Sequence, residues 1–146
     1  MKIRILLVDD EKEFVETLAE RLRTRGFHVT KAYSGDEAIE TLKEYNFDVT
    51  ILDVQMPGMD GIEALGVIKK LKPLTEVLML TGHGTIETAI EGMKIGAYDF
   101  LIKPCKMDVL LEKINGAYER KSEHEERIRK ALVDKLSTSP RSVLEK

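Results

Sequence analysis

Five short apolar segments, each followed by residues with helical spacing, most narrowly constrain the fold of this chain. They recur about every two dozen residues, at 3–8, 27–33, 49–52, 77–80 and 100–102. Runs of Val, Ile and Leu without polar alternation are typical of strands covered on both faces. The second segment alternates and is more typical of an edge strand. Strands that alternate with helices indicate an α/β domain, so we predict a doubly wound five-stranded parallel sheet with helices on both faces.

Capping signals place helices between these strands. Ser34 precedes Glu37 by three residues, which is a capping box, and Asp60 and Glu63 form a similar pair. Pro73 is expected to end the helix that Asp60 begins, because proline cannot continue a helix. Each predicted helix except the last therefore joins the end of one predicted strand to the start of the next.

The character of the chain changes near residue 120. Almost every residue from 119 to 127 is charged, and a short apolar stripe follows. Lys121 and Glu125 interrupt the heptad pattern, so a sustained coiled coil is not predicted. We predict one domain over residues 1–120. Over residues 121–146 we predict a charged helical extension whose side chains lie in solvent, with a disordered C-terminal end at Ser137-Thr138-Ser139-Pro140.

Composition excludes several classes of function. The net charge of -3 provides no basic surface for nucleic acid, so direct nucleic-acid binding is not expected. The single cysteine, Cys105, cannot form an internal disulfide, which fits a reducing compartment. No apolar run approaches the roughly 20 residues of a membrane span, and no signal peptide precedes the first strand. We therefore expect a cytoplasmic protein that does not contact the membrane.

Polar side chains follow four of the five predicted strands. They are Asp9 and Asp10 after the first strand, Asp53 after the third, Thr81 after the fourth and Lys103 after the fifth. Ligands of doubly wound sheets bind outside the carboxyl ends of the strands, so we expect these five side chains to converge. Taken alone, Asp53 is equally compatible with a structural carboxylate that accepts N–H groups of the following loop. The whole set favours a chemical site.

The predicted set of side chains suits phosphoryl transfer. Three close carboxylates repel one another, and one lysine offsets only one of them, so a cation is expected. Oxygen ligands in a site open to water and phosphate favour Mg²⁺. The Lys103 ammonium and the Thr81 hydroxyl can then bind phosphoryl oxygens while Asp53 acts as the nucleophile.

In this order and spacing, the motifs resemble the receiver domain of two-component response regulators over about residues 2–120. They are Val8-Asp9-Asp10, Asp53 within Leu-Asp-Val-Gln-Met-Pro-Gly-Met-Asp-Gly, Leu-Thr-Gly-His-Gly around Thr81, and Lys103-Pro104. The resemblance implies a flavodoxin-like fold with strand order 2-1-3-4-5. Leu-Thr-Gly-His-Gly is similar to receivers of the nitrogen-regulation type, whose outputs are σ54-dependent activators. Cys105 stands where the family usually has phenylalanine, a departure that weakens packing and affects no catalytic role.

The resemblance also implies a role for each residue at the site. Asp53 resembles the phosphoacceptor. Asp10, Asp53 and the backbone carbonyl of Gln55 resemble the direct Mg²⁺ ligands, and Asp9 resembles a ligand that acts through water. Gln55 and His83 occupy positions that border the path of the attacking water.

Three further features follow from the resemblance. Thr81 and Lys103 resemble the pair that binds the phosphoryl oxygens, and a cis peptide bond is expected between Lys103 and Pro104. Thr81 and Phe100 resemble the switch residues. Phosphorylation should draw the Thr81 hydroxyl toward the phosphoryl group, and the Phe100 ring should turn inward to fill the space that is vacated.

We therefore predict a phosphorylation-controlled signalling switch and not an enzyme with a separate substrate. A sensor histidine kinase or a phosphotransfer protein would phosphorylate Asp53. A downstream protein, or a second copy, would bind the face made by the fourth helix, the fifth strand and the fifth helix. The chain could instead be the receiver fragment of a longer σ54-type transcriptional activator. A small-molecule phosphatase of the haloacid dehalogenase type is disfavoured, because Glu11 stands where that class needs a second aspartate two residues after Asp9. The intact site argues against a receiver that acts without phosphorylation.

Overall fold

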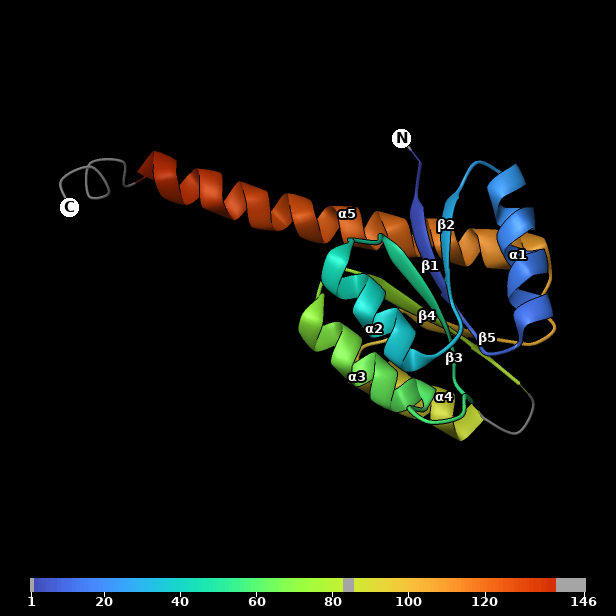
Figure 1. The fold of residues 1–146 in the computed structure, drawn as a ribbon. Coiled ribbons are helices and arrows are strands. Elements are labelled where there is room, and N and C mark those ends of the chain that lie inside the picture. Colours follow the sequence, from blue (N-terminus) through green and yellow to red (C-terminus); the bar gives the residue numbers. More distant parts are fainter. Residues whose placement is uncertain (1, 83–85, 139–146) are drawn as a thin grey trace.

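A computed structural model describes residues 2–82 and 86–138 as three layers, with a parallel sheet between two sets of helices (Figure 1). The strands are β1 (Arg4–Val8), β2 (His28–Ala32), β3 (Val49–Asp53), β4 (Glu76–Thr81) and β5 (Asp99–Ile102). The helices are α1 (Lys12–Thr24), α2 (Gly35–Glu44), α3 (Gly61–Leu71), α4 (Ile86–Ile95) and α5 (Met107–Thr138). The strand order is β2-β1-β3-β4-β5, with every pair parallel, which confirms the predicted doubly wound sheet.

The sheet separates two hydrophobic cores. Alternate residues of β1 point to opposite faces, so Ile5 and Leu7 pack with α1 and α5, whereas Leu6 and Val8 pack with α2, α3 and α4. Because both faces are covered, the central strands are apolar along their length except at their ends and at Thr50. This burial is the physical reason for the continuous apolar runs in the sequence.

The helix caps lie where the sequence predicts them. The Ser34 hydroxyl oxygen accepts the Glu37 backbone N–H at 3.1 Å, and an Asp60 carboxylate oxygen accepts that of Glu63 at 2.9 Å. Helix α3 ends at Leu71, two residues before Pro73.

The fourth strand is longer than its apolar run. It includes the polar residues Glu76 and Thr81 at its two ends, which are both buried. The Glu76 N–H donates to the Asp48 carbonyl at 3.1 Å, so the ladder continues where the apolar pattern has stopped.

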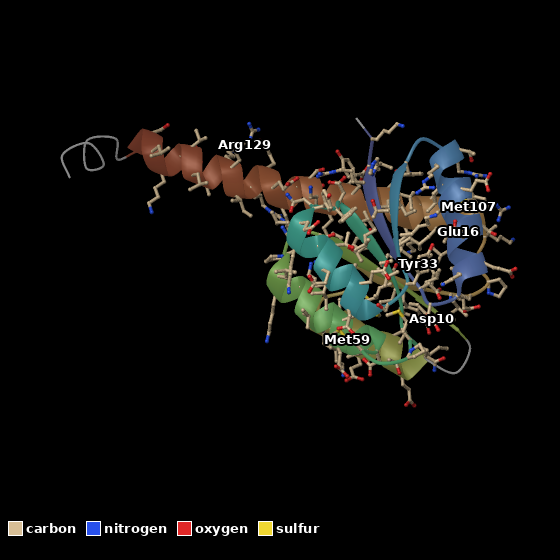
Figure 2. All side chains as sticks on the ribbon, in the orientation of Figure 1. Asp10, Glu16, Tyr33, Met59, Met107 and Arg129 are labelled. Carbon is tan, nitrogen blue, oxygen red and sulfur yellow. The ribbon has the colours of Figure 1, made fainter. Side chains whose placement is uncertain are left out.

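Helix α5 continues well beyond the sheet as a single element (Figure 1). Side chains project from this extension on several sides, Arg129 among them (Figure 2). The helical extension was predicted, but Lys121 was expected in solvent and is 8% exposed. Its ammonium lies 2.7 Å from Asp48, because a lysine at this turn reaches the buried acid that precedes β3. The boundary at residue 120 remains a prediction. The predicted disordered end began at Ser137, but residues 137 and 138 belong to the last turn of α5, and residues 139–146 lie outside the described residues.

No helix in the described part of the chain has both the length and the apolar character that crossing a bilayer requires.

Candidate phosphoryl-transfer site

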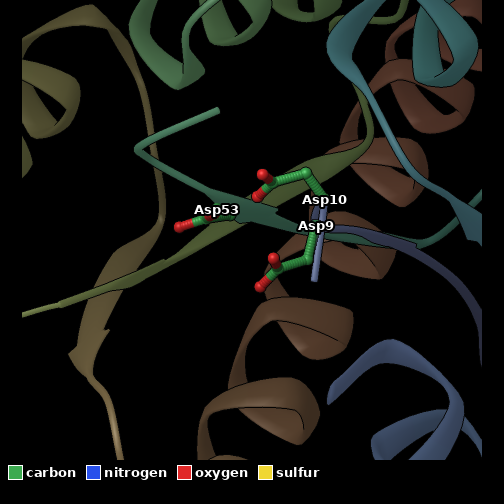
Figure 3. Close-up of side chains that lie close together, drawn as sticks. All are labelled: Asp9, Asp10 and Asp53. Carbon is green, nitrogen blue, oxygen red and sulfur yellow. The ribbon is translucent and has the colours of Figure 1, made fainter. Parts of the chain in front are cut away.

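Three carboxylates meet at the carboxyl edge of the sheet (Figure 3). Val8 pairs with Leu52 in the β1–β3 ladder, so the residues that follow them, Asp9 and Asp53, emerge side by side. Asp9 and Asp53 are 1% and 5% exposed, whereas Asp10 is exposed. Oxygen atoms from the three carboxylates all lie within 4.8 Å of one another. The structure thus brings together the three acids that the sequence singled out.

The loop after β3 folds back closely on its own strand. Gly58 has φ +78°, a conformation that L side chains rarely adopt. The Gly61 N–H donates to the Val54 carbonyl at 2.9 Å, and a Cβ at Gly61 would lie 2.5 Å from the Asp53 carbonyl oxygen. Gly58 therefore lets the loop turn, and Gly61 lets helix α3 start directly beside the end of β3, where Asp53 stands.

Lys103 places a positive charge beside two of these acids. Its ammonium lies 2.6 Å from Asp9 and 3.8 Å from Asp53. The Lys103 backbone N–H donates to the Thr81 carbonyl at 2.7 Å, which ties the end of β5 to the end of β4. The peptide bond between Lys103 and Pro104 is cis, as predicted.

Burial and charge alter the protonation of the site. Burial, with the neighbouring Asp9 charge, raises the pKa of Asp53 to about 6. Burial lowers the pKa of Lys103, but the hydrogen bond to Asp9 and the charges of Asp53 and Asp9 outweigh it, so the net pKa is raised. Lys103 thus remains charged, but its single positive charge is outnumbered by the carboxylates beside it.

The donor set fits a hard divalent cation. In the described part of the chain, Asp9, Asp10 and Asp53 form a group whose oxygens are close enough to share one ion. Because Asp10 is exposed, an ion held here would keep several waters, as Mg²⁺ prefers. The Gln55 backbone N–H lies 3.4 Å from an Asp53 oxygen. The role of its carbonyl as a ligand stays a prediction.

The two expected switch residues lie on neighbouring strands. Thr81, at the end of β4, is fully buried, and its hydroxyl donates to the Gly82 carbonyl at 3.2 Å. Phe100 on β5 pairs with Met79 on β4, and its half-buried ring packs against the core beneath α4. His83 lies outside the described residues, so its predicted place beside the attacking water remains a prediction.

Comparison with known proteins decides the family. Residues 5–115 match the model of the response regulator receiver domain. The chain is a receiver domain of this family. The two-component resemblance seen in the motifs is therefore confirmed, and the signalling function of the domain follows from it.

Individual relatives of this receiver domain agree with the match. The transcriptional regulatory protein ZraR of Salmonella typhimurium is 43% identical over 116 residues, which cover 80% of this chain and 26% of ZraR. A receiver domain from Clostridium thermocellum superposes with a TM-score of 0.79 at 37% identity, covering 82% of this chain and 97% of that one. NtrX from Brucella abortus, in complex with ADP, superposes with a TM-score of 0.82 at 35% identity, covering 86% of this chain and 29% of NtrX. The chain spans about a quarter of the length of the curated relatives that it matches.

Two residues at the edge of this receiver site were not assigned from the sequence. Glu11 lies 3.3 Å from the Lys103 ammonium, which also lies 4.4 Å from the centre of the Phe14 ring. The available signal was the position of Glu11 directly after the Asp9–Asp10 pair, at the start of a helix where Ser, Thr or Asp is the more usual cap.

Proposed function

We propose that this receiver domain accepts a phosphoryl group on Asp53 and thereby changes which protein it binds. The supporting observation is the place of Asp53 as a buried carboxylate at the end of β3, between two other carboxylates and the Lys103 ammonium. A nucleophile in this setting has positive charge beside it to receive phosphoryl oxygens.

The proposed reaction begins from a phosphohistidine of the donor protein. An Asp53 carboxylate oxygen attacks phosphorus, a P–O bond forms and the P–N bond breaks, and the leaving imidazole takes up a proton. Lys103 binds one phosphoryl oxygen, and the Thr81 hydroxyl turns from the Gly82 carbonyl to bind another. Later attack by water on phosphorus releases phosphate and restores Asp53.

The metal in this proposal is Mg²⁺. We assign its direct ligands as Asp10, Asp53 and the Gln55 carbonyl, with Asp9 acting through a water molecule. Bound there, Mg²⁺ supplies positive charge that the transferred phosphoryl oxygens need. The close set of carboxylate oxygens supports the assignment.

The proposed partners follow from the family. A sensor histidine kinase or a phosphotransfer protein donates the phosphoryl group, and the protein acts in the cytoplasm. The responding partner, or a second copy, binds the face formed by α4, β5 and α5. Apolar side chains of α4 support this assignment, since Ile86, Ile90 and Met93 are 47%, 48% and 38% exposed.

We propose that the output is control of transcription by a longer regulator. The support is the name of ZraR as a transcriptional regulatory protein and the quarter of its length that this receiver spans. An output of the σ54-dependent type follows from the nitrogen-regulation resemblance around Thr81.

Labelling with a small phosphodonor tests the phosphoacceptor. The protein is incubated with Mg²⁺ and acetyl phosphate, trapped with borohydride, and the adduct is mapped by mass spectrometry. We expect the adduct on Asp53 and none in Asp53→Asn. Asp36→Asn, which removes an exposed acid from the first turn of α2, is the matched control and should label as the wild type does. Label on another residue, or full labelling of Asp53→Asn, would refute the assignment.

A further inference from the structure

Lys103 is shared by three acids, and the phosphoacceptor is the most distant of them. Its ammonium lies 2.6 Å from Asp9, 3.3 Å from Glu11 and 3.8 Å from Asp53. Asp9 and Asp53 are fixed at the ends of buried strands. Glu11 is different, because its side chain is 66% exposed.

The conformation of Glu11 directs it to the site and not to its own helix. It stands at the N-cap of α1 with extended backbone angles, φ -80° and ψ 94°, yet its side chain makes no capping hydrogen bond. Its backbone N–H instead donates to an Asp9 carboxylate oxygen at 3.0 Å. That bond places the Glu11 backbone beside the acid that Lys103 binds most closely, so the Glu11 carboxylate is within reach of the same ammonium.

We propose that Glu11 is a positioning residue that holds Lys103 beside Asp9 and opposes its movement to the phosphoryl group on Asp53. The inference rests on the proposed role of Asp53. A phosphoryl group adds about two negative charges and must draw the lysine from its two nearer partners. Glu11 opposes the movement of Lys103 in two ways. It attracts the Lys103 ammonium, and it adds negative charge near the incoming phosphoryl group.

The test compares Glu11→Gln with Glu13→Gln. Both variants remove one exposed negative charge from the start of α1, and among the described residues the acids in contact with Lys103 are Asp9, Glu11 and Asp53. Affinity for beryllofluoride, a phosphoryl mimic, is measured in the presence of Mg²⁺. We expect Glu11→Gln to bind about two- to fivefold more tightly than the wild type, the range that one exposed ion pair supports. Glu13→Gln should change affinity much less.

A second measurement reports on the lysine itself. The ¹⁵N and ¹H shifts of the Lys103 ammonium are recorded without Mg²⁺ or beryllofluoride. We expect these shifts to change in Glu11→Gln and to stay as in the wild type in Glu13→Gln. A general effect of losing one charge at the start of α1 would instead be the same in both variants.

The outcomes separate the two proposals. If the wild type binds beryllofluoride and the two variants bind alike, or if Glu11→Gln binds more weakly, the role of Glu11 is wrong while Asp53 keeps its assignment. If the wild type neither binds beryllofluoride nor labels on Asp53, the proposed function fails and the role of Glu11 falls with it.

Discussion

At the scale of single residues, the surroundings of Asp53 disfavour its ionised form. Its carboxyl is buried and faces Asp9, and Lys103 is bound more closely by Asp9 than by Asp53. Burial and the Asp9 charge therefore raise the pKa of Asp53 to about 6. The folded protein holds a proton on Asp53 in a range of pH where the unfolded chain has lost it.

The first prediction concerns this protonation in protein free of Mg²⁺. Because the folded pKa lies above the unfolded value of 3.8, ionisation costs stability as pH rises through about 6. We expect a ¹³C NMR titration of the Asp53 carboxyl to have its midpoint near that pH, and Mg²⁺ to lower it. A midpoint below 4 in metal-free protein would show that Lys103 already compensates the charge.

The same linkage predicts the effect of removing the charge. Above pH 7 and without Mg²⁺, Asp53→Asn should raise the free energy of unfolding by about 1–3 kcal/mol, since no buried anion remains beside Asp9. Urea unfolding at pH 5 and pH 8 measures it. The gain should be larger at pH 8 than at pH 5, and an equal gain at both would contradict the electrostatic cause.

Residue-scale prediction from the sequence succeeded where strand ends decided the position. Asp9, Asp53 and Lys103 were predicted together because each directly follows an apolar strand. Glu11 was missed, since no periodic pattern determines whether an exposed side chain caps its helix or turns to a neighbouring lysine. Lys121 was misplaced for a related reason, because it stands in a charged run but reaches a buried partner.

At the scale of elements, the close approach of α3 to β3 depends on one glycine. A Cβ at Gly61 would lie 2.5 Å from the Asp53 carbonyl oxygen and from the Val54 Cα, which are backbone atoms that cannot move aside independently. We expect Gly61→Ala to lower the free energy of unfolding by about 2–4 kcal/mol. Gly66→Ala, in the same helix with open space around it, should instead be neutral or stabilising by up to about 1 kcal/mol. If urea unfolding shows that Gly61→Ala and Gly66→Ala lose the same free energy of unfolding, the steric argument is wrong.

Two ion pairs hold α5 where it leaves the sheet. Lys121 lies 2.7 Å from Asp48, just before β3, and Arg120 lies 3.0 Å from Glu76, the first residue of β4. Hydrogen bonds outweigh the burial of Lys121 and raise its pKa, and the Lys121 and Arg4 contacts lower that of Asp48 despite its burial. Both side chains are therefore charged at neutral pH.

Removing the Lys121 charge should be costly because it leaves the buried Asp48 with weaker partners. We expect Lys121→Met to lower the free energy of unfolding by about 2–4 kcal/mol. Lys130→Met, exposed further along α5, is the control and should change it by less than about 0.5 kcal/mol. If the two variants unfold at the same urea concentration, the Asp48–Lys121 pair does not anchor the helix.

Element prediction from the sequence was strongest for strands and weakest for the orientation of helix faces. Periodicity predicted α4, yet Ile86, Ile90 and Met93 are substantially exposed, while Ala89 and Gly92 form its buried side. Apolar spacing identifies a helix but does not say which face meets the sheet. The small buried residues allow α4 to lie close to β4, where Gly92 faces Met79.

At the scale of the whole molecule, the site and the proposed binding face lie on connected strands. Asp53 ends β3, Thr81 ends the adjacent β4, and Phe100 lies on β5, which is part of that face. A movement of the Thr81 hydroxyl toward a phosphoryl group would vacate space that the Phe100 ring can fill. The two states need to differ by only a few kcal/mol for phosphorylation to exchange them.

The most direct test of this account is an NMR titration of ¹⁵N- and ¹³C-labelled protein with beryllofluoride and Mg²⁺. The account predicts new side-chain conformations at Thr81 and Phe100 and shift changes that extend from Asp53 across α4, β5 and the start of α5, with none of these in Asp53→Asn. Thr81 and Phe100 that keep one rotamer while the α4–β5–α5 face still changes would contradict the proposed route from Asp53 to the surface.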